Sequence, residues 1–279
     1  MLPDRFVDPW ELLNPREAWV IVVVIASLGF ANYVMLRLYG MRGSYYSAFL
    51  GGLVNSTAAA TELSTLFRGT ENSDSMAVAI IMMTSIAMFL RNFVILGIFA
   101  PSAMNTAMLP LGAMVLAALA AVWKYRARGT VPTGQLRLAS PVSLPHVLEF
   151  AAIFVALSAA GTLAQRYFGA LGFSALSVIG GLVSSASTTA TAAALVARGK
   201  VAPQSGGIAV VLTSMASVFV DMPIVYRHIR ERSVSRRLVA ASSIVIALGL
   251  LVMIVAPRYT SNFTGPASTD ISRDIMRKF

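Results

Sequence analysis

The strongest constraint on this 279-residue chain is a series of apolar runs without a charged side chain, of which residues 18–36 and 244–255 are two. In lipid, every backbone N–H and C=O group must be hydrogen-bonded within the protein, so a crossing chain forms helices or a closed barrel. Continuous apolar runs lack the alternation of barrel strands, and a helix of about 20 residues crosses the ~30 Å hydrocarbon core. We therefore predict an all-α polytopic membrane protein.

Charge and cysteine content agree with a membrane location. Charged residues make up 12% of the chain and the mean hydropathy is +0.73, against about 25% charged residues in soluble domains. The net charge of +10 comes from basic residues that cluster between apolar runs, as topology signals do, so we expect the lipid bilayer and no nucleic acid as partner. The acidic start of the chain does not match a cleavable signal peptide, and the chain holds no cysteine for disulfides or thiolate sites.

A short phrase occurs twice. Gly51-Gly52-Leu-Val-Asn-Ser-Thr is followed, 129 positions later, by Gly180-Gly181-Leu-Val-Ser-Ser-Ala. The same offset, without a gap, aligns residues 37–43 with 166–172 and residues 84–87 with 213–216. The sequence therefore predicts a duplicated unit in a single membrane domain: repeat 1 over residues 15–124, a cytoplasmic linker over 125–143, repeat 2 over 144–256 and a flexible tail over 257–279.

The apolar pattern predicts four stretches per repeat. We expect them at residues 17–36, 44–67, 76–99 and 111–123, and at 144–165, 173–196, 206–226 and 238–255. Pro101 and Pro110 are expected to bracket an uncharged loop between the third and fourth stretches. The repeated phrase lies in the second stretch of each repeat.

The basic loops indicate how the repeats are oriented. The linker and the loop at residues 227–237 are both rich in arginine, so both should be cytoplasmic, yet three full crossings between them would separate them. We predict that the two phrase-bearing stretches are re-entrant, with each repeat keeping about three spanning helices and repeat 2 inverted relative to repeat 1. The helix breaks are expected at Gly51, Gly52, Gly180 and Gly181; a kinked spanning helix is the alternative.

Hydroxyl and amide residues follow each glycine pair. Such residues are preferred helix N-caps, so each run should open a half-helix just past the glycines. A half-helix N-terminus favours an anion, whereas hydroxyls and freed carbonyls suit a cation; close helix packing would use the same residues. The candidate substrate- or ion-binding residues are Asn55, Ser56, Thr57, Ser184, Ser185, Ser187 and Thr188.

Charged residues within the apolar stretches are the other candidates, because such residues are costly in lipid and usually functional. Glu62 and Asp221 are candidate ion-binding residues, and Asn92 occupies the place in repeat 1 that Asp221 has in repeat 2. We predict a pair between Arg91 and Asp221, assisted by Asn92, which acts either as a gate or as a structural salt bridge. The identity of any metal is left open.

The phrase, its preceding Arg-x-x-Gly at Arg37 and Arg166, and the opening Asn14-Pro15-Arg16-Glu17-x-Trp19 are similar to a known family. The chain resembles the multi-pass membrane domain of unknown function found C-terminal to MgtC/SapB-type domains. The resemblance implies a prokaryotic inner-membrane protein, a transporter by its topology, and an MgtC-like partner domain. It supplies no substrate or catalytic residue, and an associated magnesium label is weak because only Glu62 and Asp221 offer the carboxylates that Mg²⁺ prefers.

Three functions compete. A secondary transporter, exporter or channel for a small solute or ion, with a midplane site between the repeats, is favoured. A non-transporting membrane regulator or scaffold with a polar packing core is the alternative. An enzyme is not expected, because no nucleophile–base pair stands out and only His146 and His228 are available. No cofactor is expected, and the oligomeric state is open, with a homodimer as one alternative.

Overall fold

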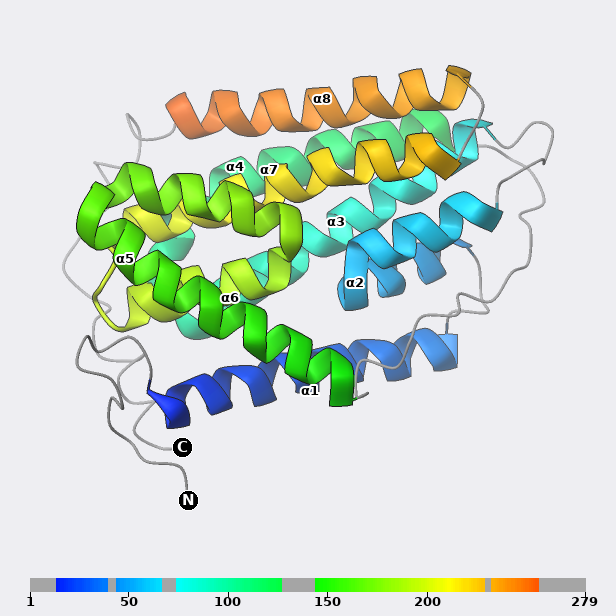
Figure 1. Ribbon diagram of the computed structural model, residues 1–279. Coiled ribbons are helices and arrows are strands. Elements are labelled where there is room, and N and C mark those ends of the chain that lie inside the picture. Colours follow the sequence, from blue (N-terminus) through cyan, green and yellow to red (C-terminus); the bar gives the residue numbers. More distant parts are fainter. Residues whose placement is uncertain (1–13, 40–43, 67–73, 127–143, 229–231, 256–279) are drawn as a thin grey trace.

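The computed structural model describes residues 14–39, 44–66, 74–126, 144–228 and 232–255 (Figure 1). Within these ranges the chain is helical and has no strand, so the prediction of an all-α chain is confirmed there. Residues 127–143 of the predicted linker and the whole predicted tail, 257–279, lie outside the described residues. The helices are α1 Pro15–Tyr39, α2 Ser44–Leu66, α3 Asp74–Phe99, α4 Pro101–Tyr125, α5 Leu144–Val183, α6 Ser185–Ala197, α7 Pro203–His228 and α8 Arg232–Val255.

Five of the described helices contain segments long and apolar enough to cross a membrane: Ser75–Phe99, Pro101–Tyr125, Leu148–Val183, Pro203–Pro223 and Ser233–Val255. A shorter apolar helical segment, Ala18–Ser27, lies in α1. The protein is therefore a multi-pass helical membrane protein.

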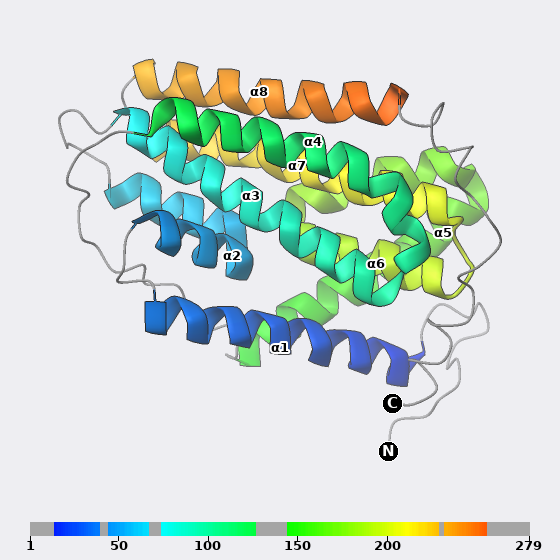
Figure 2. The ribbon, with the colours of Figure 1, turned by 180° about the vertical axis from the view of Figure 1, so that it is seen from behind.

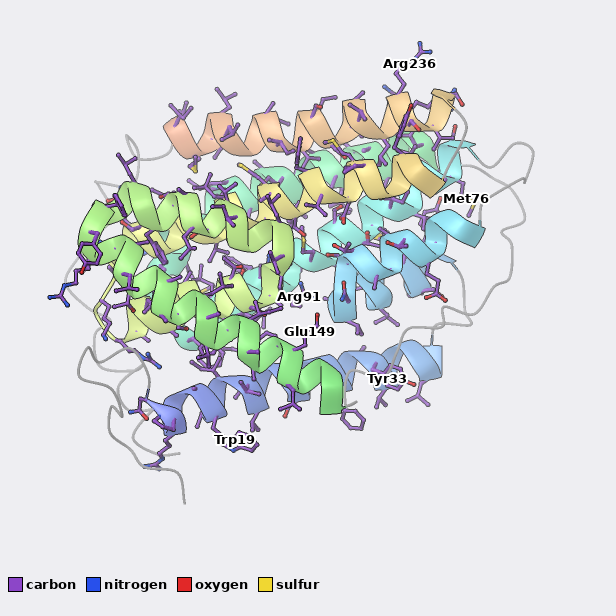
Figure 3. The ribbon with its side chains drawn as sticks, viewed as in Figure 1. Trp19, Tyr33, Met76, Arg91, Glu149 and Arg236 are labelled. Atoms are coloured by element: carbon purple, nitrogen blue, oxygen red, sulfur yellow. The ribbon has the colours of Figure 1, made fainter. Side chains whose placement is uncertain are left out.

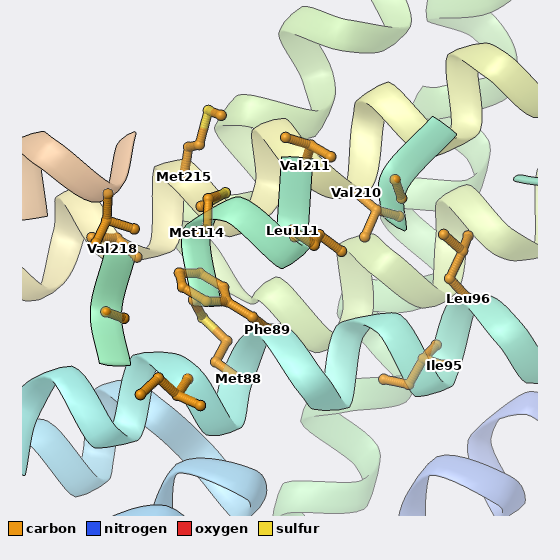
Figure 4. Packing of buried hydrophobic residues seen from close by; sticks show 14 of the residues in the cluster. Met88, Phe89, Ile95, Leu96, Leu111, Met114, Val210, Val211, Met215 and Val218 are labelled. Carbon is orange, nitrogen blue, oxygen red and sulfur yellow. The ribbon is translucent and has the colours of Figure 1, made fainter. Parts of the chain in front are cut away.

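Helices α3 and α7 form the centre of the molecule. Their apolar windows are 72% and 67% buried, against 28% or less for the windows in α4, α5 and α8. Figure 4 shows the packing where α3, α4 and α7 meet, with Phe89, Met114 and Met215 among the labelled side chains. Side chains on the outer helices remain exposed, such as Leu116 on α4 at 68% and Ile254 on α8 at 69%, which is the expected lipid-facing surface.

The expected loop between Pro101 and Pro110 is absent, and that prediction was wrong. Helix α3 ends at Phe99, Ala100 is non-helical, and α4 begins at Pro101 and runs through Pro110. Proline fits the first turn of a helix because its missing N–H would have had no intrahelical acceptor there. A proline further along is tolerated in a membrane helix because neighbouring groups compensate for the lost bond.

The breaks in the repeated stretches follow the glycines. Asn55 interrupts α2 with φ −155° and ψ 106°, and Ser184 separates α5 from α6 with φ −157° and ψ 107°. These two residues are 129 positions apart, so the repeats break at the same place with the same backbone conformation. The prediction of breaks at Gly51, Gly52, Gly180 and Gly181 was wrong: all four glycines lie within helix and are buried.

Capping explains why the breaks fall where they do. The Asn55 side chain accepts a hydrogen bond from the Ala58 N–H at 3.1 Å, and the Ser184 hydroxyl accepts one from the Ser187 N–H at 3.3 Å. Each side chain thus satisfies an N–H group that a helix start leaves without a backbone partner. The expectation that a half-helix opens just past the glycines is confirmed in both repeats.

The glycines instead allow close helix packing. A Cβ added to Gly52 would lie 2.7 Å from the Thr84 Cα, and one added to Gly181 would lie 2.8 Å from the Thr213 Cα. Thr84 and Thr213 are equivalent under the 129-residue offset. Helix α2 therefore packs on α3 in the way that α5 packs on α7, as small residues permit in membranes.

The two broken stretches reach the middle of the molecule from opposite ends (Figures 1 and 2). Both ends of α2 lie at the same end of the molecule as Tyr39 of α1, here called the Tyr39 end, and the break lies near the middle. Helix α5 runs to the opposite end, bends at Gly169, where φ is +60°, and returns to the middle, from which α6 leads back. Glycine is suited to this positive φ because it has no Cβ.

Candidate functional site

Polar side chains gather where the two breaks meet. We call them the central polar cluster: Arg91 and Asn92 on α3, Ser214 and Asp221 on α7, Thr57 on α2, and Ser185 on α6. Four different helices contribute, and both repeats are represented. All six residues lie within helices that pack on one another through α3 and α7.

Arg91 connects the two breaks. Its Nη1 donates to the backbone carbonyls of Val54 at 3.0 Å and Leu53 at 3.4 Å, and its Nη2 donates to the Ser185 hydroxyl at 3.0 Å. The two carbonyls end the first arm of α2, where the partial negative charge of a helix C-terminus favours a cation. Figure 3 shows Arg91 between the ends of α2 and α6 that face the middle of the molecule.

Asp221 is a buried carboxyl with one hydrogen-bond partner among the described residues. Its Oδ1 accepts a hydrogen bond from the Thr57 hydroxyl at 3.0 Å. The side chain is 3% exposed, and Oδ2 has no hydrogen-bond partner among the described residues. A charged group in this position lacks the pairing that buried charges normally have.

The predicted pair between Arg91 and Asp221 is not formed. Arg91 is directed to α2 and α6, and Asp221 is held by Thr57. Their levels along the helices differ: Ser214 lies beside Asn92, and Asp221 is seven residues further along α7, about 10 Å at 1.5 Å per residue. The carbonyls at the α2 break and the Ser185 hydroxyl supply acceptors for Arg91 in place of the carboxylate.

Asn92 joins α3 to α7. Its Nδ2 donates to the Ser214 hydroxyl at 3.0 Å, which in turn donates to the Val210 carbonyl at 2.9 Å. Ser214 was not among the sequence candidates, although it belongs to the third repeat match, residues 213–216. Asn92 Oδ1 and Arg91 Nε are buried without a partner in the part of the chain that the structure describes.

The other candidates are divided between capping and the cluster. At the start of α6, Ser187 and Thr188 each form hydrogen bonds with the N-cap residue Ser184 and so close the first helical turn. Asn55 is exposed and caps the second arm of α2; Ser56 is buried. Glu62 lies in that second arm and is half-buried.

Two further buried hydroxyls lie outside the set of candidate site residues. Thr189 and Thr191 on α6 have no hydrogen-bond partner among the described residues, and they are 0% and 2% exposed. They continue the hydroxyl run that begins at Ser184, which was the available signal. The described residues hold no group of three or more His, Cys, Asp or Glu side chains that could bind a metal ion.

The fold and the cluster define a class: a multi-pass helical membrane protein with two equivalent broken stretches and a buried polar centre. More particularly, the chain belongs to the family described as domain of unknown function DUF4010, whose model matches residues 23–228. The match includes both broken stretches and every residue of the central polar cluster. It does not test the expected MgtC/SapB-type neighbour. No curated protein and no solved structure matches the chain.

Proposed function

We propose that this protein is a secondary transporter for a small solute or ion, built from two inverted repeats that share a site near the middle of the bilayer. Transporters of this architecture bind their substrates at the repeat interface, in helices that are broken there. The equal backbone conformations at Asn55 and Ser184 and the equal packing of Gly52 and Gly181 support the duplication.

The arrangement of the ends supports the inversion. Helix α2 begins and ends at the Tyr39 end, whereas the second arm of α5 and α6 together begin and end at the opposite end (Figure 1). The C-terminal ends of α4 and α7 and the N-terminal end of α8 all lie at the Tyr39 end (Figures 1 and 2). Because basic loops adjoin these helix ends, we assign the Tyr39 end to the cytoplasm of a prokaryotic cell.

The observation that carries the proposal is that the two charged side chains of the cluster, Arg91 and Asp221, are not paired with each other. In a purely structural core, Arg91 and Asp221 would reduce the penalty of burial by forming a salt bridge. Instead Arg91 links the two breaks, and Asp221 Oδ2, Asn92 Oδ1 and Arg91 Nε are buried without partners in the described residues. Unpaired donors and acceptors at a helix break are what a polar ligand would satisfy.

Accessibility from water distinguishes this function from that of a scaffold. Because the chain has no native cysteine, Ser56→Cys and Ser185→Cys each give a single thiol at one break without other substitutions. Everted and right-side-out vesicles are treated with a membrane-impermeant maleimide. If the protein is a transporter, we expect the maleimide to label both positions, because the site opens alternately to the two faces. Each position should be labelled faster from one side of the membrane than from the other.

Two further single cysteines serve as controls. Arg126→Cys, at the exposed end of α4, reports vesicle orientation, and Leu116→Cys, on the exposed apolar face of the same helix, reports the background from lipid-facing thiols. Absence of labelling at both breaks, in both orientations, would show a closed polar core and favour the regulator or scaffold. No catalytic role is proposed for the cluster.

A further inference from the structure

The central polar cluster contains one fully buried carboxyl. Among carboxylates whose side chains are described, Asp221 is 3% exposed, Glu62 is half-buried and Glu149 is exposed. Asp221 lies in the apolar segment Pro203–Pro223, and its equivalent in repeat 1 is the neutral Asn92. Repeat 2 therefore places an ionisable group where repeat 1 has none.

Among the side chains that the structure describes, no cation neutralises Asp221 in this conformation. Helix α7 packs against α2, α3, α4, α5, α6 and α8. The charged side chains described on these helices are Glu62 on α2, Arg91 on α3, Lys124 on α4, Glu149 and Arg166 on α5, and Arg236 and Arg237 on α8, with none on α6. The partner of Asp221 is the Thr57 hydroxyl, and the donors of Arg91 are directed to α2 and α6.

We propose that transport is coupled to protons and that Asp221 Oδ2 is the atom that carries the proton. This inference rests on the proposed transport function and names its coupling ion. An unpaired carboxylate inside a membrane protein is costly, so a neutral form is favoured in this conformation. Binding converts the carboxylate and one proton from water into a carboxylic acid, and release returns the same proton to water on the other side.

A proton fits the available atoms better than a metal cation does. Protonation needs a single free oxygen, and Oδ2 has no other partner among the described residues. A metal cation must regain several oxygen ligands in place of its hydration shell. The Thr57 hydroxyl donates its hydrogen to Asp221 Oδ1, as expected beside the carbonyl oxygen of an acid.

Loss of the proton would act on the α2 break through Arg91. An ionised Asp221 attracts the guanidinium, whose present contacts are the Leu53 and Val54 carbonyls and Ser185. Movement of Arg91 toward the carboxylate would release both breaks at once. The proton would thereby select between a state in which Arg91 holds the breaks together and one in which it does not.

Charge displacement tests the proposal without knowledge of the substrate. Purified protein in liposomes on a solid-supported membrane is subjected to a pH jump at constant Na⁺, and then to a Na⁺ jump at constant pH. We expect a transient current on the pH jump, which Asp221→Asn reduces to the level of empty liposomes and Asp221→Glu retains. Glu149→Gln, which removes an exposed carboxylate from α5, should leave the current unchanged.

The outcomes separate this proposal from the transport function. A parent protein without a pH-jump current, or a current that Asp221→Asn leaves intact, overturns proton coupling at Asp221; a Na⁺-jump current lost in Asp221→Asn replaces the proton by Na⁺. If Ser56→Cys and Ser185→Cys are still labelled from water, transport survives these results. Size-exclusion chromatography of each variant checks that it folds. If Asp221→Asn does not fold, Asp221→Glu provides the test.

Discussion

Glycine-to-alanine substitutions at Gly52 and Gly181 test the packing that places the two breaks. The added Cβ at Gly52 would lie 2.7 Å from the Thr84 Cα and carbonyl oxygen and 2.9 Å from the Ala87 Cβ. At Gly181 the corresponding distances are 2.6 Å to the Thr213 carbonyl oxygen, 2.8 Å to its Cα and 3.0 Å to the Ala216 Cβ. These neighbours are backbone or Cβ atoms, which cannot rotate away, so the helices must separate.

The expected magnitude follows from two opposed effects. Overpacking a close contact costs about 1–3 kcal/mol, whereas alanine is favoured over glycine within a helix by about 1 kcal/mol. Gly112→Ala, in α4, isolates the second effect, because no atom lies within 4 Å of its added Cβ. The two packing variants should therefore be less stable than the parent, and Gly112→Ala should equal or exceed the parent in stability.

Thermal unfolding in detergent, followed by fluorescence-detected size-exclusion chromatography, measures the difference. Relative to Gly112→Ala, a loss of about 1–3 kcal/mol corresponds to a fall of roughly 2–10 °C in apparent Tm for a protein of this size. The falls for Gly52→Ala and Gly181→Ala should be alike, since the two contacts are equivalent. If Gly52→Ala melts at or above the melting temperature of Gly112→Ala, the close approach of α2 to α3 is refuted. The same result for Gly181→Ala would refute the close approach of α5 to α7.

Four other substitutions test the break geometry. Asn55→Ala and Ser184→Ala each remove a cap and should lower the free energy of unfolding by about 0.5–2 kcal/mol; melting unchanged in both would contradict the capping. Gly169→Ala, where φ is +60° and ψ is −151°, should lower the free energy of unfolding by about 1–3 kcal/mol through backbone strain. Steric overlap does not contribute, since no neighbouring atom lies within 4 Å of the added Cβ. An unchanged melting temperature would argue against the bend. Arg91→Met removes the link between the breaks and should speed maleimide labelling of Ser185→Cys, whereas slower labelling would contradict a linking role.

The helical membrane fold was predictable because it depends on long-range averages. Apolar content and charge-free runs identify helices irrespective of the details of packing. The equivalence of the two broken stretches was also predictable, since the offset that aligns Gly52 with Gly181 also aligns their contacts Thr84 and Thr213. Helix ends were less predictable: Pro110, read as a loop boundary, lies inside α4.

The positions of the breaks depend on helix packing as well as on local helix propensity. A Gly-Gly pair has low helix propensity in isolation, but Gly52 and Gly181 lie against neighbouring helices, which favour close approach of small residues. Helix packing therefore outweighs the low helix propensity of the glycines. The breaks lie at Asn55 and Ser184, whose side chains can cap the next arm. The signal for the break was the cap residue.

The pairing of charges was unpredictable for a geometric reason. Equivalence under the repeat offset relates Asn92 to Asp221, but equivalent residues touch only if both lie near the axis that relates the repeats. Here Asn92 donates a hydrogen bond to Ser214. Asp221 lies further along α7 and accepts a hydrogen bond from Thr57. Arg91 has no equivalent arginine in repeat 2, where position 220 is Val220, so the repeat pattern gave no information about its partners.

The hydrogen bonds of the equivalent residues Asn92 and Asp221 are asymmetric. Asn92 bonds to Ser214 at 3.0 Å; the equivalent residues are Asp221 and Ser85. Asp221 bonds instead to Thr57, and the Ser85 hydroxyl donates only to the Ile81 carbonyl, at 3.4 Å. The residue equivalent to Thr57 is Ala186, which has no hydroxyl to offer Asn92.

With inverted repeats, the second state of a transporter arises when the repeats exchange conformations, and Asp221 would then pass from Thr57 to Ser85. Ser85→Ala should therefore reduce the pH-jump current while leaving the melting temperature close to that of the parent, because the Ser85 hydroxyl makes only a long contact here. Thr57→Val should lower both, since it removes the bond to Asp221. Ser158→Ala, which removes a buried hydroxyl without a partner among the described residues from α5, should change neither. A Ser85→Ala current equal to that of the parent would exclude Ser85 as the second partner of Asp221, and with it the exchange between the repeats at this residue.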